Sequence, residues 1–248
     1  MKIYFFSDVH LGLEEKLREE KKERALLNFL DSLKKDATEI FILGDLFDYW
    51  FEYEHVIPRG YHRVISKLDE LVRQKIKIHY ILGNHDFWMK DYFEKDLKIS
   101  VHREPIEILR NKKKFYLHHG DGLALRDYGY KILKILFRAK FTIWLFSMLH
   151  PDFAARIAKK TSKASRSHTS QKDYGETDGM IKIANNKFSE GFDFVIMGHR
   201  HQSMFQNFDK NIYVNLGDWI NEKTYATFDG KNLILKKWIE NAKNSTKK

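Results

Sequence analysis

The stretch "IKIHYILGNHD", residues 76–86, joins an apolar segment to an amide, an imidazole and a carboxylate side chain. Its apolar part is typical of a buried strand, and two similar segments precede it at residues 3–6 ("IYFF") and 39–43 ("EIFIL"). Helical patterns lie between these segments, at about residues 14–33 and 61–73. This alternation predicts parallel strands that are connected by helices.

Each of the three predicted strands ends in a polar cluster, namely "SDVHLG", "GDLFDYW" and "GNHDFW". Ligands of open α/β sheets collect at the carboxyl ends of strands, so we expect the three clusters to converge. After Asn84 the pattern becomes antiparallel, with hairpin turns expected near residues 111–113 and at Asp229–Gly230. The sequence therefore predicts a mixed sheet with a β-rich second half.

Residues 127–170 differ from the rest of the chain because they are rich in aromatic and basic side chains. They predict two helices broken at Pro151, followed by a flexible Ser/Lys/Arg segment. We interpret this segment as an insertion into a core made of residues 1–126 and 171–248.

The composition limits the chemistry and the location of the protein. The chain of 248 residues has no cysteine, which excludes disulfides, thiolate zinc sites and cysteine nucleophiles. The N-terminal apolar run is too short for a signal peptide, and the longest apolar run, residues 141–149, is about half of a spanning helix. We expect a cytoplasmic protein, and the net charge of +10 favours an anionic partner.

The strand ends carry five clusters of metal-ligand residue types. Any one of them alone is more often a turn or a helix cap. Together they supply the roughly seven or eight ligands, one carboxylate shared, that two divalent cations need. Donors without sulfur suit Mn, Fe or Zn. The clusters are Asp8 and His10 in "SDVH", Asp45 in "GDLFD", Asn84, His85 and Asp86 in "GNHD", His119 in "HHGD", and His199 and His201 in "GHRH".

The order of these motifs, from D-x-H at Asp8 to G-H-x-H at His201, resembles the calcineurin-like metallophosphoesterases. The resemblance implies an α/β fold, a four-layer α-β-β-α sandwich of mixed sheets with a helical cap. It also implies two divalent metal ions. One metal is expected on Asp8, His10 and His201, the other on Asn84, His119 and His199, with Asp45 as the bridge.

The same resemblance assigns roles to the residues that follow the amide ligand. His85 is expected to stabilise the transition state or to protonate the leaving oxygen. Asp86 is expected to orient His85.

Four segments, "GDLFDYWFEY", "GNHDFW", "HGDGLALRDYGYK" and "LGDW", resemble the UDP-2,3-diacylglucosamine pyrophosphatases of lipid A synthesis. The resemblance implies cleavage of UDP-2,3-diacylglucosamine to 2,3-diacylglucosamine 1-phosphate (lipid X) and UMP, on the cytosolic face of the inner membrane. One position departs from the pattern, because His85 stands where the better-known members have Arg. "GNHD" is the pattern of metallophosphoesterases at large.

The cap combines apolar and basic side chains, which suits two acyl chains and an anionic membrane surface. The alternative is a cap that only packs on the core. Asp127 and Tyr130 resemble sugar-contacting residues of the family. The basic stretch "KKTSKASRSH" could bind a sugar phosphate, and the alternative is a solvated basic loop. The residues expected to contact the phosphate are Lys160, Ser162, Lys163 and Arg166.

Two other functions remain open from the sequence. One is a phosphodiesterase for a soluble substrate, in which the cap would hold no apolar tunnel. The other is a nucleic-acid-binding protein, suggested by the charge. It is disfavoured because no nucleic-acid-binding motif is present and many lysines lie on alternating-charge helices such as "LEEKLREEKKERALL". The sequence predicts no oligomeric state.

Overall fold

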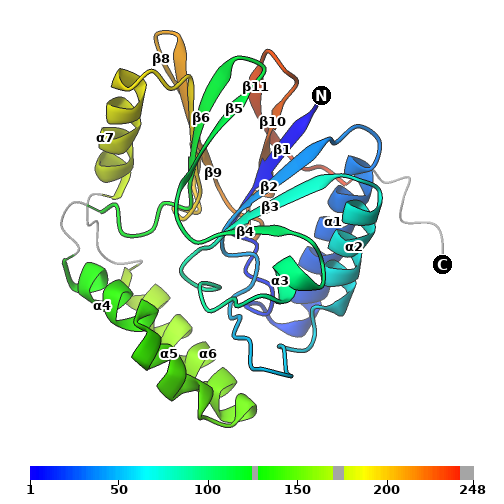
Figure 1. Cartoon of the computed structure of the whole chain (residues 1–248), viewed down its shortest axis with the longest axis vertical. Coiled ribbons are helices and arrows are strands. Elements are labelled where there is room, and N and C mark those ends of the chain that lie inside the picture. The colour runs from blue at the N-terminus through cyan, green and yellow to red at the C-terminus, as the bar shows by residue number, and fades with distance from the viewer. Residues whose placement is uncertain (125–127, 170–175, 241–248) are drawn as a thin grey trace.

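The computed structural model describes residues 1–124, 128–169 and 176–240. Two sheets stand side by side in it (Figure 1). The first sheet has the strand order β11 (Leu233–Lys237), β10 (Thr224–Phe228), β1 (Ile3–Phe6), β2 (Glu39–Leu43), β3 (Lys77–Ile81) and β4 (Ser100–His102). The second has the order β5 (Ile106–Arg110), β6 (Lys113–His118), β7 (Phe194–Met197), β9 (Asn211–Leu216) and β8 (Ser203–Phe208).

Both sheets mix parallel and antiparallel pairs, as predicted. Strands β1 to β4 run parallel, and β10 and β11 add to β1 as an antiparallel hairpin. In the second sheet β6, β7 and β9 are parallel, while β5 and β8 are antiparallel edges. The expected hairpin turns near residues 111–113 and at Asp229–Gly230 are confirmed by these pairs.

Helices cover the outer faces of the two sheets and complete the four layers. Helices α1 (Lys16–Leu33) and α2 (His62–Arg73) pack on the first sheet through a large apolar cluster that includes Phe29 and Leu68. A second cluster, with Phe5 and Phe115, fills the space between the sheets. Helix α7 (Glu176–Ser189) covers the second sheet, and the short α3 (Tyr92–Lys95) precedes β4. The predicted fold class is confirmed.

The inserted segment forms three helices, α4 (Tyr128–Arg138), α5 (Lys140–Ser147) and α6 (Pro151–Thr169), where two were expected. The additional break lies at Ala139, whose φ of −66° and ψ of 133° are extended. Pro151 begins α6, because the N–H groups of a first helical turn have no partner within the helix, so the missing N–H of proline costs nothing there. The expected flexible stretch after residue 160 continues as α6 to Thr169.

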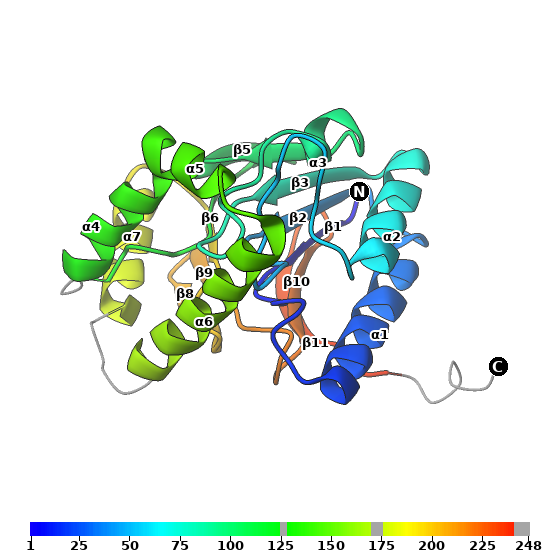
Figure 2. The ribbon, with the colours of Figure 1, turned by 90° about the horizontal axis from the view of Figure 1, so that it is seen from below.

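The three cap helices lie below the strand ends in Figure 1 and in front of them in Figure 2. Aromatic contacts attach them to the loops after β2 and β3, because Phe146 lies 5.0 Å from Phe51 and 4.4 Å from Trp88 between ring centroids. Tyr53 also donates a hydrogen bond to the Leu149 carbonyl. Among the described residues, no helix combines the length and the apolar content that crossing a membrane requires.

Candidate metal centre

Five loops, each following the carboxyl end of a parallel strand, meet in one place. Asp8 and His10 follow β1, Asp45 follows β2, and Asn84 follows β3. His119 follows β6, and His199 and His201 follow β7. Contacts between these loops confirm the convergence that the strand-end pattern predicted.

The backbone of these loops has an uncommon conformation. Positive φ angles occur at Asp8 (55°), His10 (48°), Asp45 (53°), His199 (70°) and His201 (55°). The left-handed conformation costs a non-glycine residue about 1–2 kcal/mol. Such strain gathers at functional sites, where the surrounding structure stabilises it.

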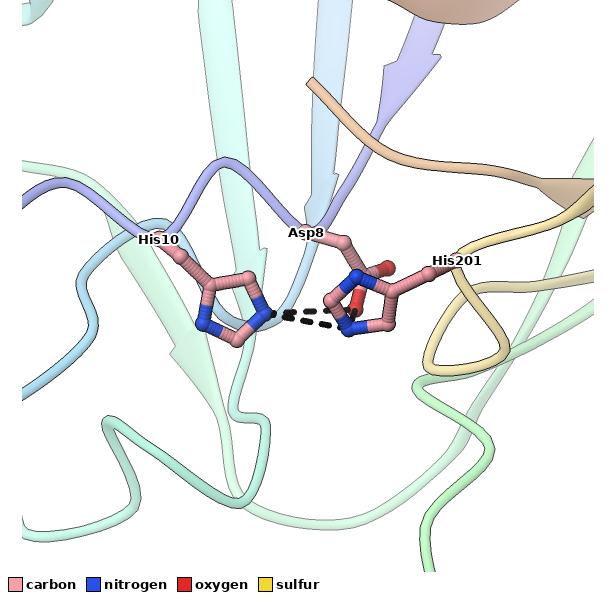
Figure 3. Close-up of side chains that lie close together, drawn as sticks. All are labelled: Asp8, His10 and His201. Carbon is pink, nitrogen blue, oxygen red and sulfur yellow. Dashed lines mark hydrogen bonds and ion pairs between the residues drawn. The ribbon is translucent and has the colours of Figure 1, made fainter. Parts of the chain in front are cut away.

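The first cluster consists of Asp8, His10 and His201 (Figure 3). The Nε2 atoms of the two imidazoles are 3.3 Å apart. Oδ1 of Asp8 lies 3.6 Å from Nε2 of His201 and 3.9 Å from Nε2 of His10. Oδ2 of Asp8 accepts the His199 N–H at 2.9 Å, so Oδ1 is the oxygen left facing the imidazoles.

The second cluster consists of Asp45, His119 and His199, with Asn84 beside it. Nε2 of His119 lies 3.3 Å from Oδ2 of Asp45 and 3.1 Å from Oδ1 of Asn84. Oδ2 of Asp45 is also 3.6 Å from Nε2 of His10, in the first cluster. Because Oδ1 of Asp45 accepts the His85 N–H at 2.9 Å, Oδ2 is the oxygen placed between the two clusters.

The donor set fits divalent cations. Nδ1 of His119 is 2.7 Å from the Leu43 carbonyl oxygen and donates to it, so Nε2 is the nitrogen that faces two oxygens and can carry either a proton or a metal ion toward them. Acceptors that face one another are stable only with positive charge between them. Oδ1 of Asp8 is likewise buried and has no hydrogen bond among the described residues. The resemblance noted from the sequence implies divalent metal ions, and these residues can hold them.

The electrostatics of the site agree with this reading. Burial by itself lowers the pKa of His119, but the Asp45 carboxylate outweighs burial and raises that pKa to about 10. The pKa of His199 falls to about 4, because burial dominates there. The space beside Asp45 thus favours positive charge, while the His199 ring stays neutral and able to coordinate.

Glycines in two of the motifs make room for the two carboxylates. A Cβ atom on Gly83 would overlap the carboxylate of Asp45, and one on Gly198 would overlap the carboxylate of Asp8. The glycines of "GNHD" and "GHRH" therefore allow close approach between loops.

Asp48 is a site residue that the sequence analysis did not nominate. Its Oδ1 lies 3.4 Å from Nδ1 of His10 and 3.5 Å from Nδ1 of His85, and its carbonyl oxygen is 3.0 Å from Nδ1 of His85. Asp218 has a similar position, with Oδ2 3.6 Å from Nδ1 of His201. Asp48 ends the motif "GDLFD", three residues after the nominated ligand Asp45, and Asp218 lies in the family-like segment "LGDW". These positions were the signals by which the sequence could have nominated them.

Asp86 has a different role from the one expected. Its fully buried carboxylate accepts the N–H of Gly83 at 2.8 Å, the N–H of Leu46 at 3.0 Å and the hydroxyl of Tyr80. Burial, with Asp45 nearby, raises the pKa of Asp86 to about 6. Asp86 connects the loop after β2 to the loop after β3 by hydrogen bonds. The oxygens that lie beside the His85 ring belong to Asp48.

The nominated substrate contacts all belong to the cap. Lys160 lies exposed on α6. Tyr130 on α4 and Ser162, Lys163 and Arg166 on α6 have helical backbones, but their side chains lie outside the described part of the structure. Asp127 lies outside the described residues altogether.

Comparisons with known proteins agree with this geometry. The sequence profile described as "Calcineurin-like phosphoesterase" matches residues 1–203. A protein of Porphyromonas gingivalis named UDP-2,3-diacylglucosamine hydrolase is 35% identical, over 94% of this chain and 96% of its own. One of the same name from Aeromonas salmonicida is 28% identical, over 90% of this chain and 87% of its own.

Similarity to solved structures is more distant. A structure titled as a novel archaeal phosphodiesterase is 14% identical with a TM-score of 0.49, and the match covers 96% of this chain and 99% of that chain. Similarity at this level carries no argument about activity.

Proposed function

This chain belongs to the calcineurin-like phosphoesterases, and from that premise we propose that it cleaves the pyrophosphate of UDP-2,3-diacylglucosamine. The products are 2,3-diacylglucosamine 1-phosphate and UMP. The observation that carries this proposal is the combination of a two-cluster donor set with near full-length similarity to proteins named for that substrate. The chain is thus a phosphoesterase, and its specificity for the lipid substrate is tested by comparing hydrolysis of UDP-2,3-diacylglucosamine with hydrolysis of a simple diester.

We assign the two clusters to two metal ions. Asp8, His10 and His201 would hold one ion, and Asp45 would contribute to holding both. The second ion would be held by Asn84, His119 and His199. Manganese is the proposed metal, with iron or zinc as the alternatives, because the donors are nitrogen and oxygen without sulfur. When bound, such ions supply Lewis acidity and lower the pKa of a water nucleophile.

The chain's own residues orient these groups and meet the developing charge. Leu43, Asp48 and Asp218 lie behind the imidazoles of His119, His10 and His201, which keeps each Nε2 directed into the site. His85 lies beside the first cluster, with its ring centroid 4.7 Å from that of His10. It would stabilise the phosphoryl oxygens or the leaving oxygen by a hydrogen bond, and Asp48 orients it.

The cap is proposed to receive the lipid. Helices α4 and α5 each expose apolar side chains at i, i+3 and i+4 spacing, which makes one apolar stripe per helix. An exposed apolar surface rimmed by lysines suits acyl chains and peripheral binding to the cytosolic face of the inner membrane. The exposed residues are Ile132, Ile135 and Leu136 on α4, and Phe141, Trp144 and Leu145 on α5.

The remaining assignments concern the sugar and its phosphate. Asp127 and Tyr130 at the start of the cap, and Lys160, Ser162, Lys163 and Arg166 on α6, stay as proposed substrate contacts. Residues 127–170 are accordingly proposed as the substrate-binding unit, and residues 1–126 and 171–248 as the catalytic core.

The test is turnover of UDP-2,3-diacylglucosamine by the purified, manganese-loaded protein, with bis(p-nitrophenyl) phosphate as a parallel substrate and the products identified. Release of UMP and lipid X supports the proposal. Cleavage of the simple diester with the lipid untouched would retain the phosphoesterase and reject the lipid substrate.

A further inference from the structure

A cation pair on the cap is attached to the core next to the proposed metal ligands. Asp121 follows His119 by two residues and is 3% exposed. Nζ of Lys134 lies 2.7 Å from Oδ2 of Asp121 and donates to its carbonyl oxygen at 3.1 Å. Arg138, one helical turn further along α4, reaches the same carboxylate oxygen at 3.4 Å.

This pair carries more charge than its anchor neutralises. Among the described residues, Lys134 and Arg138 both contact this one carboxylate, so the pair brings two positive charges to one negative charge. Lys134 and Arg138 have side chains 24% and 29% exposed, which leaves both accessible from solvent.

The pair lies at the edge of the metal centre, between two of its loops. The guanidinium of Arg138 stacks over the ring of Phe87, 5.6 Å from its centroid, and Phe87 is two residues beyond His85. Asp121 stands just beyond His119 on the other side. Among the described residues, Arg138 donates to Asp121 through Nη2 alone, so a guanidinium with five N–H groups retains donors for an anion.

A pyrophosphate diester presents two phosphates, and the metal clusters account for one. We propose that Lys134 and Arg138, positioned by Asp121, bind the second phosphate and make the site selective for pyrophosphate over simple phosphodiester substrates. Guanidinium and ammonium groups suit phosphate oxygens because charge-assisted hydrogen bonds are strong in a partly desolvated site. This inference rests on the proposed function for the identity of the substrate.

The test compares UDP with UMP as ligands, because they differ by one phosphate. Binding of each nucleotide to the metal-loaded protein is measured by calorimetry for wild type, K134Q, R138Q and the double variant. Wild type should bind UDP about tenfold or more tightly than UMP, and the double variant should lose this preference while UMP affinity stays within about twofold. K140Q, on exposed α5, is the matched control and should behave as wild type.

Conservative variants separate charge from packing. R138K and K134R retain the charge and should retain most of the UDP preference. A wild type without any UDP preference, or a double variant that keeps it, would overturn the inference. An equal loss of UDP and UMP binding would also overturn it, because that result indicates general damage to the cap.

Failure of the two proposals can be told apart. If the pair governs UDP binding but UDP-2,3-diacylglucosamine is not hydrolysed, the proposed lipid substrate is rejected and the phosphate-binding role of the cation pair is retained. If the lipid is hydrolysed and the variants keep the UDP preference, the function stands and the pair has no phosphate-binding role.

Discussion

Nε2 of His119 lies 3.3 Å from Oδ2 of Asp45, with each residue supplied by a different sheet. The backbone holds both groups in place, because Leu43 accepts from Nδ1 of His119 and the His85 N–H donates to Oδ1 of Asp45. The two atoms therefore face one another with no choice of orientation, and the place between them favours a positive charge, which a proton or a metal ion can supply.

Replacing Asp45 by Asn tests the shared carboxylate. D45N should lower turnover about a thousandfold or more, because loss of the bridging charge removes several kcal/mol of transition-state stabilisation. Its bound metal, measured by elemental analysis after gel filtration, should also fall. D209N, in an exposed turn between β8 and β9, is the matched control. Full metal content together with full activity in D45N would refute the bridging role.

His85 should act on the reaction and not on metal retention. H85N is expected to lower kcat about a hundredfold, the usual contribution of a positioned acid–base or hydrogen-bonding group. Metal content should equal that of wild type. The exposed His55 provides the control variant H55N. Metal loss in H85N as large as in D45N would show that His85 is needed to build the centre.

Replacement of Asp48 should change both metal affinity and kcat, since one oxygen of its carboxylate lies near His10 and His85. D48N should weaken metal affinity about tenfold, as loss of an outer partner of a ligand histidine commonly does, and lower kcat at saturating metal. Metal titration of activity, with the plateau compared to wild type, separates the two quantities. An unchanged midpoint and an unchanged plateau would show that Asp48 orients neither ring.

The Glu39–Arg110 pair joins the two sheets and predicts a pH dependence of stability. Arg110 donates to both carboxylate oxygens of Glu39 at 2.7 and 2.8 Å. Burial would raise the pKa of Glu39, but Arg110 and His79 outweigh it and lower this pKa from 4.5 to about 2. A carboxylate whose folded-state pKa is depressed stabilises the fold above pH 4.5, and this contribution disappears as the pH falls toward 2.

The variant E39Q should therefore lower the free energy of unfolding by about 2 kcal/mol at pH 7. Urea unfolding between pH 3 and pH 7 should show the difference from wild type shrinking as the pH falls. E107Q removes a surface ion pair with Lys187 and should cost no more than about 0.5 kcal/mol at any pH. A difference for E39Q that is independent of pH would exclude the ion pair as its source.

The apolar stripe on α5 should matter for lipid and not for small substrates. Phe141 and Trp144 are 68% and 55% exposed, so F141E/W144E should fold normally. Its binding to vesicles of anionic phospholipid, measured by flotation, should fall about tenfold or more, since even one aromatic ring gains about 1.5–3 kcal/mol on burial. Hydrolysis of bis(p-nitrophenyl) phosphate should stay unchanged.

An exposed leucine on the edge strand β5 provides the comparison for this variant. L109E adds a negative charge away from the cap and should leave vesicle binding near the wild-type level. Equal losses in both variants would indicate simple charge repulsion and not a cap-specific contact with lipid.

Much of the fold and of the centre could be predicted from local patterns. Apolar runs such as "EIFIL" and "IKIHYIL" indicate strands by themselves, and the helices between them require parallel pairing. Because parallel strands end at one edge, the convergence of Asp8, Asp45 and Asn84 followed from chain order alone. The break at Ala139 was not predicted, since nothing in its residue type marks a helix end.

The sequence by itself determined which candidate metal ligands reach the centre, because strand ends and ligand types are properties of short segments. Only the tertiary structure decided how they act there. It showed which oxygen of Asp8 and of Asp45 faces the site, because the other oxygen is held by a backbone N–H from a distant loop. It placed Asp48, and not Asp86, in contact with the His85 ring. It also placed Lys134 and Arg138 beside Asp121. These choices depend on contacts between residues far apart in the chain, which no local pattern encodes.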